Sequence, residues 1–107
     1  MKNLIIAILL LVLTGSFAPI RTEKIHEVHI EGMRFIPKNI EIKVGETVRW
    51  INPTSDAHNV ADKNDEFRSK MLTKNDVFSY RFTKPGVYNY YCQPHRIMGM
   101  KGTVVVK

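Results

Sequence analysis

The sequence has very little cysteine: Cys92 is the only one among 107 residues. A single cysteine excludes a disulfide within the chain. It also excludes structural zinc sites and iron–sulfur clusters that take several thiolates from one chain. In an exported protein, a cysteine without a partner is a candidate for a reactive or metal-bound thiol. Cys92 is therefore the first residue that a functional interpretation has to explain.

The chain also lacks an acidic excess, a long helical pattern and the length for a second domain. Sixteen lysines and arginines outweigh ten acidic residues, which gives a net charge of +6. These basic residues are scattered among the acidic ones rather than clustered, so no nucleic-acid partner is expected. The positive balance instead favours an acidic protein partner or surface.

The first eighteen residues have the pattern of a targeting segment. Lys2 precedes an unbroken apolar run from Leu4 to Leu13, which has the length of a signal-peptide core and is too short to cross a bilayer alone. A small-x-small pattern ends at Ala18, but Pro19 disfavours cleavage there. We expect residues 1–18 to be a signal peptide or an uncleaved anchor. The protein is accordingly expected to be exported to the periplasm, and attached to a membrane only if this segment is retained.

Apolar and polar residues alternate through most of the remaining chain, which is typical of half-buried strands. The alternation is clear around residues 25–31, 40–44, 47–52, 77–82 and 87–92. Residues 103–106 are apolar on both faces, as expected of a central strand. Six or seven short strands separated by turn signals predict an all-β Greek-key sandwich. We assign residues 24–107 to this one domain.

The segment 61–76 does not fit the strand pattern. It is polar and charged, and its large apolar residues are Phe67, Met71 and Leu72. We expect a surface excursion that these three side chains attach to the core, with a helical turn within it as an alternative.

The residues after Cys92 form a set of soft metal ligands. His95 follows three positions later, and Met98 and Met100 lie in the same short loop. Thiolate and thioether ligands favour copper, and a His₂Cys site with a weak axial methionine is the arrangement of blue-copper electron-transfer centres. Such a centre needs one further histidine from elsewhere in the chain.

Three histidines could supply this ligand. His58 follows a loop rich in turn residues, and loops gather at the ends of a β-sandwich, so His58 can meet Cys92 there. His26 and His29 are three apart on one predicted strand and point to opposite faces. We interpret these two as exposed strand histidines, with a weak second metal site as the alternative.

At this point the chain resembles a known family. From about Val28 to Lys107 it is similar to cupredoxins of the plastocyanin, amicyanin and pseudoazurin group. The matching motifs are Met33-x-Phe35-x-Pro37, Val44-Gly45-x-Thr47-Val48-x-Trp50-x-Asn52, His58-Asn59-Val60, Gly86-Val87-Tyr88-x-Tyr90-x-Cys92-x-Pro94-His95 and Gly102-x-Val104-x-Val106.

The resemblance implies an eight-stranded Greek-key sandwich that transfers single electrons through one type 1 copper. It implies His58, Cys92, His95 and one methionine as copper ligands. In these families the ligand methionine is followed by x-Gly-x and a valine-rich strand. Met100 has this sequence after it, so we predict Met100 as the axial ligand and Met98 as an apolar neighbour of His95. The residue after the first histidine, here Asn59, is implied to orient the ligands.

The resemblance also implies a docking surface around His95, where the partner would be another redox protein. Plastocyanins surround a second exit near Tyr91 with acidic residues, but this chain has no comparable acidic run. Arg96 and Lys101 flank the copper loop instead. We therefore expect a monomer that meets a cytochrome or an oxidoreductase with an acidic docking face.

Two other functions compete with electron transfer. Copper trafficking or copper tolerance is the alternative, because loops rich in methionine and histidine serve that role. An enzyme is not expected: no carboxylate adjoins the loop as a general base for a catalytic zinc. Multicopper enzymes need a His-Cys-His run, whereas Cys92 lies between Tyr91 and Gln93.

Overall fold

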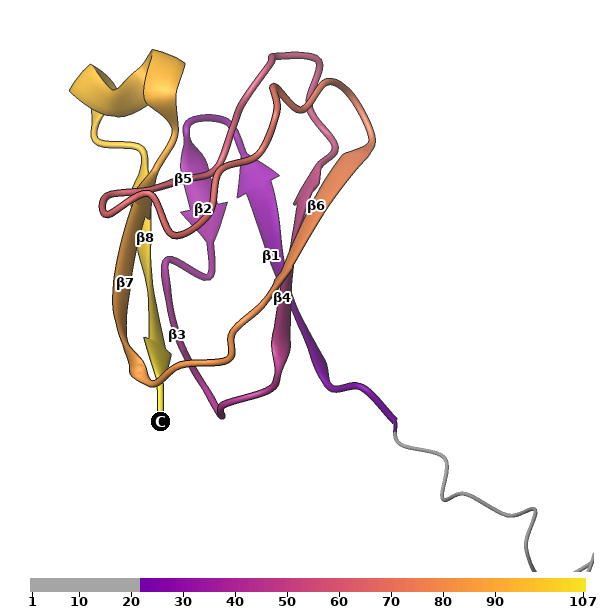
Figure 1. Ribbon diagram of the computed structural model, residues 1–107. Coiled ribbons are helices and arrows are strands. Elements are labelled where there is room, and N and C mark those ends of the chain that lie inside the picture. Colours follow the sequence, from indigo (N-terminus) through magenta and orange to yellow (C-terminus); the bar gives the residue numbers. More distant parts are fainter. Residues whose placement is uncertain (1–21) are drawn as a thin grey trace, which may run out of the picture.

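Two four-stranded sheets pack face to face in the computed structural model, which describes residues 22–107 (Figure 1). The predicted leader, residues 1–18, lies outside the described residues. In chain order the elements are β1 (Ile25–Glu31), β2 (Arg34–Ile36), β3 (Asn39–Ile42), β4 (Thr47–Asn52), β5 (Ala61–Asp62), β6 (Asp76–Arg81), β7 (Gly86–Tyr91), the 3₁₀ helix η1 (Gln93–Met98) and β8 (Lys101–Val106).

One sheet has the strand order β2-β1-β4-β6, and the other has the order β3-β8-β7-β5. The pairs β1–β4 and β3–β8 are parallel, and the remaining pairs are antiparallel. The prediction of an all-β sandwich is confirmed. The strand at the end of the chain is central, as predicted, because β8 lies between β3 and β7.

Alternation along the strands produces the core between the sheets. In β7, Tyr90 is buried while Val87 and Asn89 on the other face are exposed. Trp50 from β4 is fully buried and packs edge-on against Tyr90 across the sandwich, with ring centroids 5.3 Å apart. Burying a large apolar side chain contributes about 1.5–3 kcal/mol. These contacts therefore fix the distance between the sheets that carry the two halves of the site described below.

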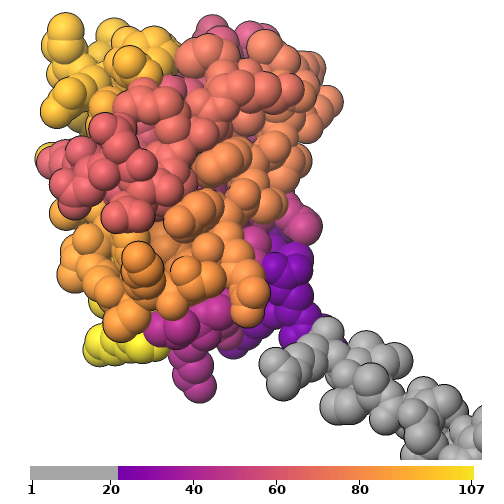
Figure 2. All heavy atoms as spheres, in the orientation of Figure 1, coloured from indigo at the N-terminus to yellow at the C-terminus, as the bar shows by residue number. Residues whose placement is uncertain are grey.

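The polar segment after β4 lies on the surface without forming a helix, so the alternative of a helical turn is wrong. Phe67 and Leu72 attach it to the core, with 5% and 1% of their surface exposed, as predicted. Met71 does not contribute to this attachment, since 43% of its surface is exposed. Figure 2 shows the part around residues 60–70 spread over the surface of the molecule.

The helix η1 lies at one end of the sandwich, and the C-terminus lies at the opposite end (Figure 1). Pro94 near its start suits a helix, because the fixed φ is helical and its missing N–H would have no partner there. Gly99 ends it in the left-handed conformation, with φ of 75°. Within residues 22–107, no helix is long and apolar enough to cross a membrane.

Gly102 allows β7 and β8 to pack closely, because a Cβ atom there would clash with the ring of Tyr90 and lie 2.8 Å from the carbonyl oxygen of Lys38. We expect Gly102→Ala to lower the free energy of unfolding by about 3 kcal/mol, since a rigid backbone atom and a buried ring must move. Gly32→Ala is the matched control. It meets no atom within 4 Å, and its cost of about 1 kcal/mol comes only from a φ of +56°.

Urea denaturation of both variants measures this difference. Equal stabilities for the two variants would contradict the close packing at Gly102.

Candidate metal centre

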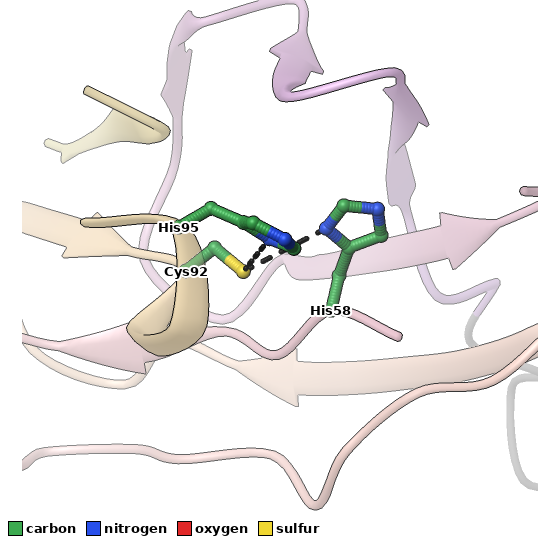
Figure 3. A group of neighbouring side chains, drawn as sticks. All are labelled: His58, Cys92 and His95. Atoms are coloured by element: carbon green, nitrogen blue, oxygen red, sulfur yellow. Dashed lines mark hydrogen bonds between the residues drawn. The ribbon is translucent and has the colours of Figure 1, made fainter. Parts of the chain in front are cut away.

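Three of the predicted ligands come together at the η1 end of the sandwich (Figure 3). The Cys92 sulfur lies 3.4 Å from Nδ1 of His95 and 3.7 Å from Nδ1 of His58. The imidazole centroids are 4.8 Å apart, and the ligand atoms all lie within 4.8 Å of one another. Residues separated by 34 positions in the sequence thus present their donor atoms to one small volume.

His58 is positioned by the loop between β4 and β5. Its backbone N–H donates to the carbonyl of Leu72 at 3.1 Å, and its own carbonyl accepts from the Leu72 N–H at 2.6 Å. The buried side chain of Asn52 donates to the same Leu72 carbonyl and to that of Asp56, both at 2.8 Å. Its oxygen accepts hydrogen bonds from the backbone and hydroxyl of Thr54. Asn52 therefore holds the loop before His58 and the segment around Leu72 in place. The sequence alone did not indicate this role.

Cys92 is positioned by the end of β7 and the return of the chain into β8. Its N–H donates to the carbonyl of Met100 at 2.9 Å, and its carbonyl accepts from the N–H of His95 at 3.2 Å. The ring of His95 is half-buried, whereas Cys92 and His58 are fully buried. The site thus has two inaccessible ligands and one that reaches the surface.

Asn59 joins the two halves of the site. Its side-chain oxygen accepts from the Gln93 N–H at 2.7 Å, and its amide donates to the Gln93 side chain at 3.3 Å. Arg68 donates to that same side-chain oxygen of Gln93 at 2.6 Å and to Asp65 at 3.0 Å. The resemblance indicated the role of Asn59. Its partners Gln93 and Arg68 were missed, because neither residue type at these positions signals a contact between loops.

The electrostatics of the site follow from burial. Burial raises the pKa of the Cys92 thiol, and the backbone N–H groups of Asn59 and His95 partly oppose this. Burial also lowers the pKa of His58, and the neighbouring His95 lowers it further. Both shifts favour uncharged side chains near neutral pH. A positive ion among them would therefore meet a neutral imidazole at His58 and a thiol at Cys92 that must lose its proton.

The two methionines of the loop differ in their surroundings. Met100 is 1% exposed and lies directly before β8, where its N–H donates to the carbonyl of His95 at 3.4 Å. Met98 is 69% exposed, and its neighbour Ile97 is fully exposed. Met100 is thus a buried residue whose backbone bonds to Cys92 and His95, whereas the side chain of Met98 lies largely in solvent.

The strand histidines lie away from this cluster. His29 is exposed, as predicted, and lies 3.7 Å from Glu27. His26 is partly buried, contrary to the prediction, and its ring contacts the carboxylate of Glu46, directly before β4, at 3.1 Å. Among residues 22–107, one cluster of histidine, cysteine and acidic side chains could hold a metal ion, and it contains neither of these histidines.

The donor set fits copper. Two ligands bound about 2.1 Å from one ion and about 120° apart would lie about 3.6 Å from each other, and the distances of 3.4 and 3.7 Å from sulfur to nitrogen agree with this. His58 Nε2 is buried without a hydrogen-bond partner, while Nδ1 points to the sulfur. A β-sandwich that holds a buried Cys-His-His cluster at one end defines the cupredoxin class.

Comparison with known proteins identifies the family. The model of the copper-binding proteins of the plastocyanin/azurin family matches residues 22–107. The chain therefore belongs to this family, and copper is its metal.

Several relatives agree with this assignment. The chain is 40% identical to amicyanin from Paracoccus versutus over 85 residues, which are 75% of this chain and 63% of that protein. It is 37% identical to plastocyanin from Scenedesmus fuscus over 84 residues, which are 68% of this chain and 86% of the other. The crystal structure of Paracoccus versutus amicyanin superposes with a TM-score of 0.71 at 36% identity. That superposition covers 82% of this chain and 85% of the other.

Proposed function

We propose that this protein carries single electrons between redox partners, through one type 1 copper held by His58, Cys92, His95 and Met100. The observation that carries the proposal is the convergence of three donor atoms from two loops into one buried volume. Copper bound there supplies a one-electron Cu(II)/Cu(I) couple. The similarity to amicyanin and plastocyanin supports the same function, in a domain of residues 24–107.

The fold holds the ligands so that little has to move when the charge of the site changes. The backbone of His58 is fixed by Leu72, and that of Cys92 by Met100. The side chain of Asn59 connects the two loops. A site that is held in one geometry for both oxidation states needs little reorganisation, which favours fast electron transfer.

Met100 is the axial ligand in this proposal because it is buried beside the cluster, whereas Met98 is exposed. The burial of His58 and Cys92 also argues against the alternative of copper trafficking. A protein that delivers copper needs ligands that an acceptor can reach, and these two side chains have no exposed surface. Nor do we propose an enzyme: within residues 22–107, the donor cluster consists of two histidines and one cysteine, with no carboxylate among its members.

The half-buried His95 is the proposed point of electron exit. Ile97 and Met98 beside it are exposed and give the small apolar surface that suits brief contacts between redox proteins. Arg96, the next residue after His95, is exposed, and its guanidinium lies 4.5 Å from the ring centroid of Tyr91, which puts a cation beside this exit. We propose a monomeric, exported carrier whose partner is a cytochrome or oxidoreductase with an acidic docking face.

Stopped-flow kinetics test this function. The ascorbate-reduced copper protein is mixed with an oxidised acidic c-type cytochrome and, separately, with a basic one. We expect electron transfer to both, with a faster reaction to the acidic cytochrome that slows as the salt concentration rises. No electron transfer to either cytochrome would contradict the carrier function. A faster reaction with the basic cytochrome would contradict only the acidic docking face.

A further inference from the structure

A groove runs beside the copper loop, between β2 of one sheet and the strands β3, β8 and β7 of the other. It consists of two adjoining hollows of about 450 and 280 Å³ that share Lys38 and Lys101 in their walls. Arg34 lines the first hollow and Lys63 lines the second. We call these two hollows the basic groove, because its charged lining residues are these four cations and include no acidic side chain.

The charges of the basic groove are not neutralised within the described part of the chain. None of the four cations forms an ion pair among residues 22–107. The hollows at the far end of the sandwich differ, because Glu46 lines both of them together with Lys24. There Glu46 contacts His26, and Lys107 contacts Glu41 at 3.0 Å. The basic groove thus differs from the far-end hollows in having only cations, and no carboxylate, among its charged lining residues.

The first hollow also has an apolar lining. Met33, Ile36 and Met98 contribute to it, and the side chain of Met98 is largely exposed. Met98 follows His95 by three positions in η1, so a ligand in this hollow would lie next to the proposed electron exit. A cationic wall beside an apolar lining fits an acidic ligand that carries some apolar side chains.

The shape of the groove distinguishes a polypeptide from a membrane. Its cations line concave hollows, whereas the headgroups of a bilayer form a broad surface that contacts convex parts of a protein. A narrow extended chain can enter the hollows and bring carboxylates to Lys38 and Lys101 together. Complementary charges across a protein interface determine which partner binds and how the two surfaces are aligned.

We propose that the basic groove binds an extended acidic segment of the redox partner and so aligns that partner with His95. The identity of the occupant as a redox partner rests on the proposed function, while the binding of an acidic peptide does not.

The test uses the copper(I) protein and a fluorescein-labelled peptide rich in glutamate with interspersed leucines. Fluorescence anisotropy measures binding to the unmodified protein and to K38Q/K101Q. The variant K43Q/K84Q is the matched control, because it removes the same charge at exposed positions outside the groove. We expect K38Q/K101Q to weaken binding about fivefold to tenfold and K43Q/K84Q to weaken it less than twofold.

Three results would overturn the proposal: no binding of the peptide at low salt, an equal loss in the two variants, or tighter binding of a lysine-rich peptide. Phosphatidylserine vesicles provide a further arm. Vesicle binding that depends on Lys38 and Lys101, without peptide binding, would assign the groove to a membrane instead. The reversible redox cycle is recorded on the same samples. If the peptide does not bind but the copper is still reduced and reoxidised reversibly, the groove proposal is wrong and the proposed carrier function is unaffected.

Discussion

Replacing Cys92 with serine should remove the intense visible absorption of the Cu(II)-loaded protein and weaken copper binding at least about a hundredfold. The thiolate is the soft ligand in a set otherwise composed of imidazoles and a thioether, and blue-copper centres depend on it. Serine has almost the same shape, so the fully buried position should still be filled. Absorption spectroscopy and a competitive chelator titration measure the two effects.

The folding of Cys92→Ser needs its own control. The far-UV circular dichroism spectrum and the urea unfolding transition of the variant should match those of the unmodified apo-protein, since serine fills nearly the same volume as cysteine. A folded Cys92→Ser variant that keeps the intense band would contradict the assignment of Cys92 as a copper ligand.

The raised pKa of Cys92 adds a dependence on pH. Because burial keeps the thiol protonated in the apo-protein, copper has to displace that proton. Lower pH therefore weakens copper binding in the unmodified protein, and this contribution disappears in Cys92→Ser. Copper titrations at several pH values measure this difference: a plot of the logarithm of the copper affinity against pH should have a shallower slope for Cys92→Ser than for the unmodified protein.

Replacing Met100 with leucine should change the reduction potential strongly, while the same change at Met98 should leave it nearly unaltered. Loss of a weak sulfur donor destabilises Cu(II) more than Cu(I), so we expect the potential of Met100→Leu to rise by about 60 mV or more, a tenfold change in the equilibrium for one electron. Leucine conserves the volume of the 1% exposed Met100. A spectroelectrochemical titration measures both variants.

Met98→Leu is the matched control for this experiment, because it removes a thioether from the same loop at an exposed position. A large shift for Met98→Leu with none for Met100→Leu would reverse the assignment of the axial ligand. Equal shifts in both variants would show that the loop as a whole, rather than one sulfur, determines the potential.

Much of this fold could be predicted from the sequence, because period-two alternation directly reports strands with one buried face. The elements that were missed are short or depend on distant contacts. Strand β5 has two residues, too few for any period to show. The helix η1 begins immediately after Cys92, where the metal-ligand pattern dominated the interpretation. The burial of Phe67 and Leu72, but not of Met71, depends on which side chains face the core, and an irregular segment has no period to reveal this.

The site was predictable to the extent that chemistry limits the choice of ligands. The spacing from Cys92 to His95 pointed to a metal, and the structure brings both to His58. The residues that fix the geometry gave weaker signals. Asn52 and Gln93 act through hydrogen bonds between segments 20 and 34 positions apart, and an amide side chain in a sequence does not show where its partners lie. His26 was expected to be an exposed strand histidine, and its contact with Glu46 was missed because the two residues are 20 positions apart in the sequence.

The most direct test of a copper electron carrier is a complete redox cycle on one sample. The purified protein receives one equivalent of Cu(II), is reduced with ascorbate and is then reoxidised with ferricyanide, while absorption and bound copper are both followed. We predict an intense blue colour that bleaches on reduction, returns fully on oxidation and is accompanied by no release of copper. A protein that stays colourless with Cu(II), or that loses its copper on reduction, would contradict the account.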